Sequence, residues 1–539
     1  MTDTDVDPDA DVREQWFLTL EERRNTATRV PIWVPGNRVR ALVHGATYFD
    51  RLVDEVEALQ AGDYVFFTDW RGDPDERLRE DGPTVAGLFC AAAQRGVVVK
   101  GLVWRSHLDV FRFSEEENRH LGEVIEDAGG EVLLDQRVRR FGSHHQKLVV
   151  LRHPGAPERD VAYAGGIDLC HSRRDDADHA GDVQRQPMSA AYGDRPPWHD
   201  VQLELRGPIV GALDTVFRER WEDPTNLDVH NPIAHLRDRF DHADLHAGPL
   251  PPQPPDPQPC GPHDVQPLRT YAAIRPRYDF APLGERTVAL GYTKAIHRAR
   301  RLIYLEDQYM WSKQVAMLFA DALRANPELQ LLVVVPRYPE VDGRFGEPPH
   351  YAGREQAIDL CKKAGGDRVH LFDLENTSGT AVYVHAKVCV IDDVWASVGS
   401  DNFNRRSWTH DSELSHGVLD TTRDEREPRD PGGLGDGARV FARDLRLELW
   451  REHLGRATDA SEDVDLIDPD EAVAAFERTA YALDGWYAGG RVGPRPPGRV
   501  RPHRPERLHP LARVWAVPVY RAFLDPDGRP WRERLRGGW

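Results

Sequence analysis

The chain has 539 residues, of which 40% are hydrophobic and 29% charged, and its formal net charge is -19. This composition is typical of a folded protein of two or three domains and excludes a largely disordered chain. The acidic excess argues against a general nucleic-acid-binding protein, because most of the surface would repel a phosphate backbone.

The first residues do not resemble a targeting signal. They are rich in aspartate where a secretory signal is basic, and no apolar run follows them. No stretch reaches the ~18 apolar residues that a membrane-spanning helix requires. The five cysteines are scattered and none stands in a C-x-x-C pair, which favours reduced thiols over disulfides or a zinc site. We therefore expect a cytoplasmic protein, with peripheral membrane contact at most.

The predicted elements repeat in the two halves of the chain. After an acidic arm over residues 1–29, near-continuous apolar strands alternate with helical segments, which indicates sheets covered on both faces. The strands are expected at 63–70, 96–104, 131–135 and 147–151 in the first half, and at 301–308, 329–336, 368–372 and 387–391 in the second. Asp69 precedes His145 by 76 residues and Asp307 precedes His385 by 78. This similar spacing predicts a duplicated α/β unit.

A proline-rich segment over residues 243–269 divides the chain near its middle, because a run of prolines forms neither helix nor central strand. We expect one domain at 30–242 and a second at 270–456. The last segment, 457–539, begins with a capped amphipathic helix and continues rich in arginine, proline and aromatic residues. Two interpretations of this tail stay open. It wraps the domain surface, or its basic and aromatic side chains contact an anionic membrane.

Two His-x-Lys pairs occupy matching places in the two halves. They are His145 with Lys147 and His385 with Lys387, in a chain with 23 histidines but only seven lysines. Each pair is expected to open a strand, where residues i and i+2 share a face, so an imidazole and an ammonium stand side by side. If the halves pack about a pseudo-two-fold axis, all four side chains converge on one pocket. A lysine suits phosphate as a compact point charge.

The second half completes a known signature. It reads HAKVCVID over 385–392, GSDN over 399–402 and DSE over 411–413. This resembles the H-x-K-x4-D, G-S-x-N and E motif of the phospholipase D superfamily. The resemblance implies two α/β domains of the phospholipase D fold, with mixed sheets flanked by helices, pseudo-two-fold symmetry and an active cleft between them. An extended C-terminal segment would follow, and a monomer would suffice for activity.

The first half is similar to the N-terminal motif of the larger, eukaryotic-type enzymes of that superfamily. The similar segments are SHHQK over 143–147, GGID over 165–168 and WHD over 198–200. Residues 303–309 also resemble the strand that precedes the second motif. The loops at 170–198 and 337–346 are expected to shape the entrance to the site.

By this resemblance, His145 attacks phosphorus and forms a phosphohistidine, while His385 protonates the leaving alcohol and then activates water or an acceptor alcohol. The exchanged assignment stays open, because the two halves are similar. Lys147 and Lys387 would neutralise the non-bridging oxygens, with Asn402 as a further donor. No metal or other cofactor is implied, because the lysines supply the positive charge.

The family pattern also assigns an orienting carboxylate to each histidine: Glu413 to His385 and Asp200 to His145. Asp168 holds the place of Asn402 and is expected to fix a lysine or a backbone amide, since a carboxylate cannot donate to phosphate. Further residues follow from the motifs: Asp392, Asp168, Ser400 and Gly166 in support, and Trp198, Gln308 and Tyr309 lining the substrate site. His144 and His199 are interpreted as neighbours of the reacting groups and not as metal ligands.

The first motif departs from the pattern at Arg152, where the family has aspartate, and an insertion through Asp160 follows. Either a longer hairpin replaces a structural salt bridge, or the first site is loosened enough to change its rate or substrate. The leading interpretation is a phosphodiesterase that hydrolyses or transphosphatidylates glycerophospholipids. The alternatives are a phosphatidyltransferase of the cardiolipin-synthase type, a related nuclease, and a degenerate protein that binds phosphodiesters without turnover. No nucleic-acid partner is expected.

Overall fold

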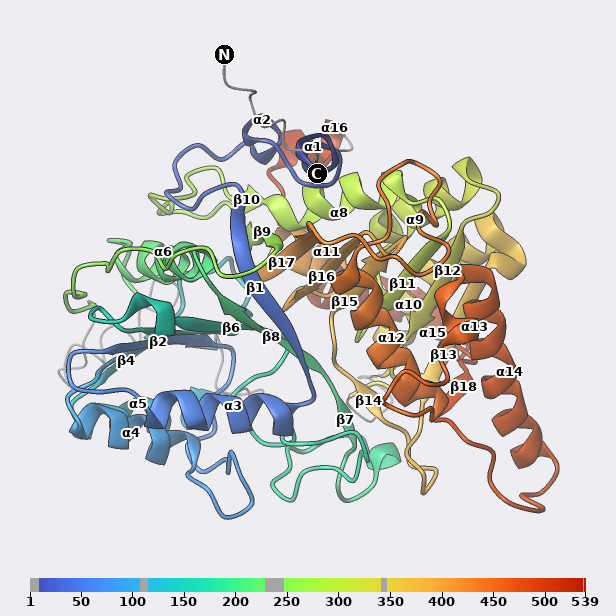
Figure 1. The fold of residues 1–539 in the computed structure, drawn as a ribbon, viewed down its shortest axis with the longest axis horizontal. Helices are drawn as coiled ribbons and strands as arrows, with labels where there is room; N and C mark the ends of the chain where they lie inside the picture. Colours follow the sequence, from blue (N-terminus) through green and yellow to red (C-terminus); the bar gives the residue numbers. More distant parts are fainter. Residues whose placement is uncertain (1–8, 107–114, 228–246, 341–346, 537) are drawn as a thin grey trace.

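The two halves of the chain form one mixed sheet with helices on both faces (Figure 1). This computed structural model describes residues 9–106, 115–227, 247–340, 347–536 and 538–539. The first half supplies β1 (Val34–Val43), β2 (Tyr64–Asp69), β3 (Val98–Trp104), β4 (Glu131–Asp135), β5 (Leu148–Arg152), β6 (Val161–Gly165) and β8 (Val201–Arg206). The second supplies β9 (His263–Tyr271), β11 (Leu302–Glu306), β12 (Gln330–Val334), β13 (Val369–Leu374), β15 (Val388–Ile391), β16 (Trp395–Gly399) and β17 (Glu413–Asp420).

The strand order shows the duplication. The first half runs β4-β3-β2-β5-β6-β8-β1 and the second β13-β12-β11-β15-β16-β17-β9. In each half the first three strands are parallel and the others antiparallel. The halves join where β1 pairs antiparallel with β9, as a two-fold axis between equivalent strands requires. The predicted duplicated α/β fold with pseudo-two-fold symmetry is confirmed.

Helices cover both faces of each half. They are α3 (Gly45–Glu57), α4 (Val85–Gln94), α5 (Glu115–Asp127) and α6 (Ile209–Trp221), then α8 (Thr287–Arg298), α9 (Lys313–Ala325), α10 (Glu347–Gly365), α11 (Arg405–Thr409), α12 (Val440–Leu454), α13 (Val464–Ile467) and α14 (Pro469–Ala488). One hydrophobic core lies under α6, α12 and α14 and continues across both halves, from Phe217 to Trp450. Separate cores lie under α3–α5 and under α8–α10. The continuous core and the shared sheet hold the halves together next to the site.

Short strands complete the sheets. β10 (Glu285–Arg286) pairs with β9, and β18 (Val500–Pro502) adds to the edge at β13. β7 (Trp198–His199) and β14 (Tyr383–Val384) form a separate parallel pair, one strand from each half. The domain boundaries predicted from composition stay a prediction. β9 begins at His263, inside the segment expected to be a linker.

Both ends of the described chain pack on the second half. The N-terminal arm forms α1 (Ala10–Trp16) and α2 (Leu20–Arg23), and Trp16 is buried in the core under α8. Residues 1–8 of this arm lie outside the described residues. The tail forms α15 (Pro510–Val519), a π-helical turn (Tyr520–Leu524) and α16 (Trp531–Arg536). Tyr520 accepts a hydrogen bond from the backbone N–H of Ser312 at 2.9 Å, so the tail is anchored beside α9.

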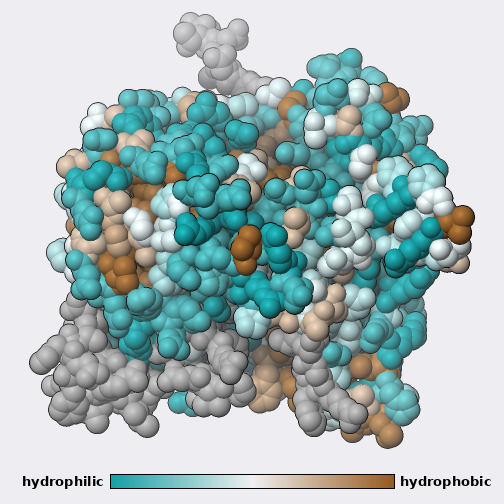
Figure 2. Space-filling view, turned by 90° about the horizontal axis from the view of Figure 1, so that it is seen from below, coloured by the Kyte–Doolittle hydropathy of each residue, from teal (hydrophilic) through white to brown (hydrophobic). Residues whose placement is uncertain are grey.

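One face of the molecule is largely hydrophilic (Figure 2). On the face shown in Figure 2, hydrophobic residues lie in small separate groups among hydrophilic ones. Within the described ranges, none of the helices combines the length and the apolar character that crossing a bilayer would need.

Candidate active site

Both His-x-Lys pairs stand immediately before a central strand, one before β5 and one before β15. In each pair the lysine Nζ donates to the backbone carbonyl of its own histidine: Lys147 to His145 at 2.9 Å, and Lys387 to His385. Each histidine also contacts a carboxylate that comes from the opposite half of the chain. The two pairs therefore share one site at the junction of the halves.

Each histidine is held by a carboxylate from the opposite half. His145 Nδ1 lies 2.9 Å from Glu413 Oε2, and His385 Nδ1 lies 2.6 Å from Asp200 Oδ2. Ser400 supports Glu413 by donating a hydrogen bond of 2.5 Å to the same oxygen. The assignment of Glu413 to His385 and of Asp200 to His145 is therefore wrong, because the pairs are crossed.

The crossing follows from backbone pairing between the halves. The His145 N–H donates to the Ser412 carbonyl at 2.9 Å, and the Ser412 N–H donates to the Ser143 carbonyl at 3.0 Å. On the other side β7 lies parallel to β14, and the His385 N–H donates to the His199 carbonyl at 2.8 Å. Glu413 directly follows Ser412, which pairs with His145, and Asp200 directly follows His199, which pairs with His385. The side chain of each acid therefore reaches the histidine of the other half.

The two lysines have different surroundings. Lys147 Nζ lies 3.1 Å from Asp168 Oδ1, so the expectation that this carboxylate fixes a lysine agrees with the geometry. Lys387 has the Gln308 carboxamide oxygen at 3.4 Å. Burial lowers the pKa of Lys387 to about 8, with Asp200 opposing the shift and Lys147 adding to it. Asn402, which follows β16, is buried, and its Oδ1 has no hydrogen-bond partner among the described residues.

His385 lies deep in this cluster of charges. Burial lowers its pKa well below the usual value, and Lys387, Arg173 and Lys147 lower it further. The Trp198 ring packs against the imidazole, with the ring centroids 5.0 Å apart. Arg173 lies over the same indole, 4.0 Å from its centroid, and donates to Asp168 at 3.2 Å. Arg173 was not among the predicted residues. It lies in the loop after β6, and no motif or periodicity marks it.

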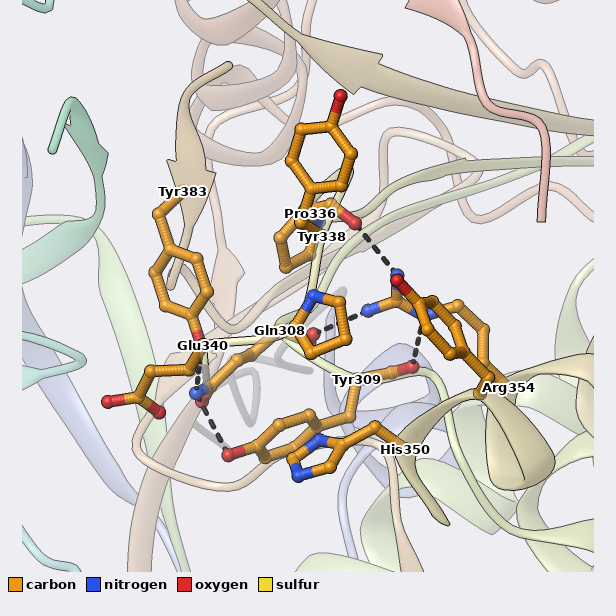
Figure 3. Close-up of a pocket in the computed structure, with 10 residues that line it drawn as sticks. Gln308, Tyr309, Pro336, Tyr338, Glu340, His350, Arg354 and Tyr383 are labelled. Carbon is orange, nitrogen blue, oxygen red and sulfur yellow. Dashed lines mark hydrogen bonds between the residues drawn. The ribbon is translucent and has the colours of Figure 1, made fainter. Parts of the chain in front are cut away.

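Gln308 and Tyr309 line a pocket (Figure 3), and Gln308 also lies beside Lys387. The Gln308 amide donates to the Tyr309 hydroxyl at 2.9 Å and to the Tyr383 hydroxyl at 2.7 Å. Arg354 from α10 fixes the backbone by donating to the Gln308 carbonyl at 3.0 Å. Glu340 also lines the pocket, and burial raises its pKa. Of the second loop expected at the entrance, residues 341–346 lie outside the described residues.

Two further motif residues, Gly166 and Asp392, support the site without belonging to the reacting groups. A Cβ on Gly166 would lie 2.1 Å from the Asp200 carboxylate, so only glycine lets Asp200 approach. Asp392 accepts the backbone N–H groups of Arg300, Arg301 and Leu302 at 2.7–2.8 Å. It therefore fixes the start of β11 and does not touch the reacting groups.

Arg152 takes a structural role. It donates to Asp160 at 2.7 Å and to Asp214 at 2.8 Å, and also to the carbonyls of Pro254 and Pro255. The insertion thus supplies the carboxylate that pairs with it. This geometry agrees with the interpretation in which the longer hairpin takes the place of a structural salt bridge made by the family's aspartate.

Comparisons with known proteins agree with these motifs. The family model described as "PLDc: Phospholipase D" matches residues 74–245 and 354–481. Phospholipase D alpha 1 of Cynara cardunculus is 25% identical over 74% of this chain and 63% of its own length. Phospholipase D alpha 2 of Arabidopsis thaliana is 24% identical over 78% of this chain and 66% of its own length. The chain therefore spans less than two thirds of these relatives. A solved phosphatidylserine synthase of Haemophilus influenzae Rd KW20 shares 13% identity, with a TM-score of 0.49, over 71% of this chain and 82% of its own.

Proposed function

Since the chain belongs to the phospholipase D family, we propose that it hydrolyses or transphosphatidylates glycerophospholipids through a phosphohistidine intermediate. One observation carries the proposal: each half contributes a histidine and a lysine, and the opposite half contributes the carboxylate that orients the histidine. A carboxylate on Nδ1 leaves Nε2 of each imidazole for the substrate. The site thus holds two histidines for two displacements at phosphorus and lysines for the anionic oxygens.

His145 is the nucleophile in this proposal. Glu413 holds the proton on Nδ1, so the Nε2 lone pair attacks phosphorus and the P–O bond to the headgroup alcohol breaks. His385 donates its Nε2 proton to that leaving oxygen. It then takes a proton from water or from an acceptor alcohol, whose oxygen attacks phosphorus and breaks the P–N bond. Lys147, Lys387 and Asn402 stabilise the charge on the non-bridging oxygens, so these steps need no metal ion.

His385 must carry a proton when the substrate is bound, although its pKa is low in the empty site. The depression has two sources, burial and the nearby cations Lys387, Arg173 and Lys147. A bound phosphodiester anion offsets those cations and favours the imidazolium. We therefore expect the substrate to bring about the protonation of its own general acid.

The C-terminal tail supports contact with a lipid surface. From residue 510 onward, the exposed large hydrophobic side chains of this segment are Leu511, Val514, Phe523, Trp531 and Leu535. They are interspersed with arginines, a combination that suits an anionic membrane surface. In this proposal the protein acts at the membrane as a peripheral, cytoplasmic enzyme.

The test is turnover of a fluorogenic phosphatidylcholine, with ethanol added and no chelator present, by the wild type, H145A and H385A. The proposal is supported if the wild type cleaves the lipid and forms phosphatidylethanol, and if both variants lose this cleavage. Release from an aryl phosphodiester but from no lipid would discard phospholipids as substrates. Transfer to a second lipid without hydrolysis would favour the phosphatidyltransferase alternative. No turnover of any diester would favour the binding protein.

A further inference from the structure

A second group of buried titratable side chains lies behind the reacting pocket, where the halves meet. His44, at the start of α3, and His179 and His199 come from the first half, and Glu452 comes from α12 in the second. One nitrogen or oxygen from each residue lies within 4.8 Å of those of the other three. The histidines are fully buried, and the Glu452 side chain is 12% exposed. None of these four side chains has a part in the phosphoryl chemistry.

The three imidazoles converge on a single carboxylate. His44 Nε2 lies 2.7 Å from Glu452 Oε2, and His179 Nε2 lies 2.9 Å from Oε1. His199 Nδ1 lies 3.5 Å from Oε1 and has no hydrogen-bond partner among the described residues. Three imidazole nitrogens and one carboxylate oxygen form a four-donor set of the kind that zinc takes in tetrahedral geometry.

An outer layer of contacts orients two of these histidines, His179 and His199. His199 Nε2 lies 2.8 Å from Glu306 Oε2, and His453 Nε2 lies 2.6 Å from the other oxygen of Glu306. His179 Nδ1 lies 3.1 Å from the Trp198 carbonyl. Metal-binding histidines typically donate their second ring N–H to a carboxylate or a carbonyl in this way. A divalent cation would also balance the charges of Glu306 and Glu452, which are otherwise costly to bury.

The backbone at two of the histidines is strained. His44 has φ 70° and ψ 158°, a region that only glycine adopts readily, and His179 has φ 53°. Such conformations persist where the surroundings dictate the position of the side chain. In both residues the strained backbone directs an imidazole to the same carboxylate.

We propose that His44, His179, His199 and Glu452 bind one divalent transition-metal ion of the zinc type, which fixes the junction of the two halves. Four protein ligands complete the coordination, so the ion is structural and takes no substrate. Its position connects it to the reacting pocket, because the His199 carbonyl accepts the N–H groups of His385 and Ala386 at 2.8 and 3.1 Å. Asp200, which orients His385, is the next residue in the chain. The proposal does not depend on which phosphodiester the protein cleaves.

Metal content of the purified full-length chain tests the site. Four proteins are produced with Zn²⁺ in the medium and gel-filtered: the wild type, H44Q, E452Q and the control H370Q. Inductively coupled plasma mass spectrometry then gives the equivalents of bound metal in each. His370 is also paired with a glutamate, Glu477 at 2.9 Å, but lies outside the cluster. The wild type and H370Q should hold one equivalent, and H44Q and E452Q should lose at least nine tenths of it. Wild type loaded with Co²⁺ should show the visible absorption of a tetrahedral site.

Two results would overturn the proposal. One is wild type that holds no first-row metal, even after refolding with Zn²⁺ or Co²⁺, and whose thermal unfolding is the same with and without a chelator. The cluster is then a protonated histidine–glutamate network. The other is metal that stays bound at one equivalent in both H44Q and E452Q, which would place the ion elsewhere. Because the first readout uses the wild type, a variant that fails to fold does not decide the question.

Discussion

Because each histidine contacts a carboxylate of the opposite half, substituting one carboxylate should affect only one of the two histidines. In E413Q the amide keeps the size of the carboxylate but removes its charge from the 2.9 Å contact with His145. In D200N the same change removes the charge from the 2.6 Å contact with His385. We expect each substitution to disturb the histidine of the opposite half and to leave the histidine of its own half unchanged.

The magnitude follows from the burial of both pairs. A hydrogen bond to a charged group contributes about 1.5–3 kcal/mol. Since each 1.36 kcal/mol of barrier is a factor of ten, either substitution should lower kcat by about 10- to 100-fold. The assay combines kcat on a soluble phosphodiester with NMR of histidines labelled at Cε1, assigned from H145N and H385N.

The NMR result decides the pairing. We expect E413Q to shift the Cε1 resonance of His145 and to leave that of His385 in place, and D200N to do the reverse. The two variants serve as controls for each other. If E413Q moved the resonance of His385 and left that of His145 unchanged, the crossed arrangement would be refuted.

Three further predictions follow from the charges. Because burial lowers the pKa of Lys387 to about 8, this lysine loses its proton as pH rises through that value. kcat/KM should therefore fall above about pH 8, and this fall should be absent in K387R. If kcat/KM of K387R fell in the same pH range, Lys387 would not be the group that titrates. R152A leaves Asp160 buried without its guanidinium partner, whereas Asp214 keeps Arg218 at 2.7 Å. Urea unfolding should show a loss of about 3–5 kcal/mol; a loss under 1 kcal/mol would contradict the structural role. Binding of inorganic sulfate, an anion that does not itself titrate near pH 7, should take up a proton, measured by calorimetry in buffers of different ionisation enthalpy. Uptake that persists in H385N would refute its assignment to His385.

Much of the fold could be predicted from local patterns. The strand expected at 63–70 is β2, Tyr64–Asp69, and the one expected at 387–391 is β15, Val388–Ile391. β15 is apolar throughout, and β2 is apolar up to its last two residues, Thr68 and Asp69, because helices cover both faces of the sheet. The pairing of β1 with β9 could not be read in the same way. Contacts between strands so far apart leave no periodic signal in either one.

Of the candidate site, the reacting histidines could be predicted from the sequence, but their carboxylate partners could not. His145 and His385 could be found because a His-x-Lys pair is rare in a chain with seven lysines and occurs in both halves. The partners of the two histidines were exchanged, because motif order places each acid in the half where it occurs in sequence. The backbone pairing across the junction decides otherwise. Arg173 and His44 were missed for a related reason: each reaches its cluster from a loop or a helix start, where spacing carries no information.

In the proposed mechanism the two halves build one site, in which His145 is the nucleophile and His385 the acid and base. The most direct test is H385N mixed with p-nitrophenyl phosphocholine. This substrate has a leaving group that needs no proton, whereas the second displacement still needs a base. Quenching at alkaline pH followed by peptide mass spectrometry should find phosphocholine on His145, and H145N should show none. Substrate consumed without any adduct, or an adduct on another residue, would contradict this mechanism.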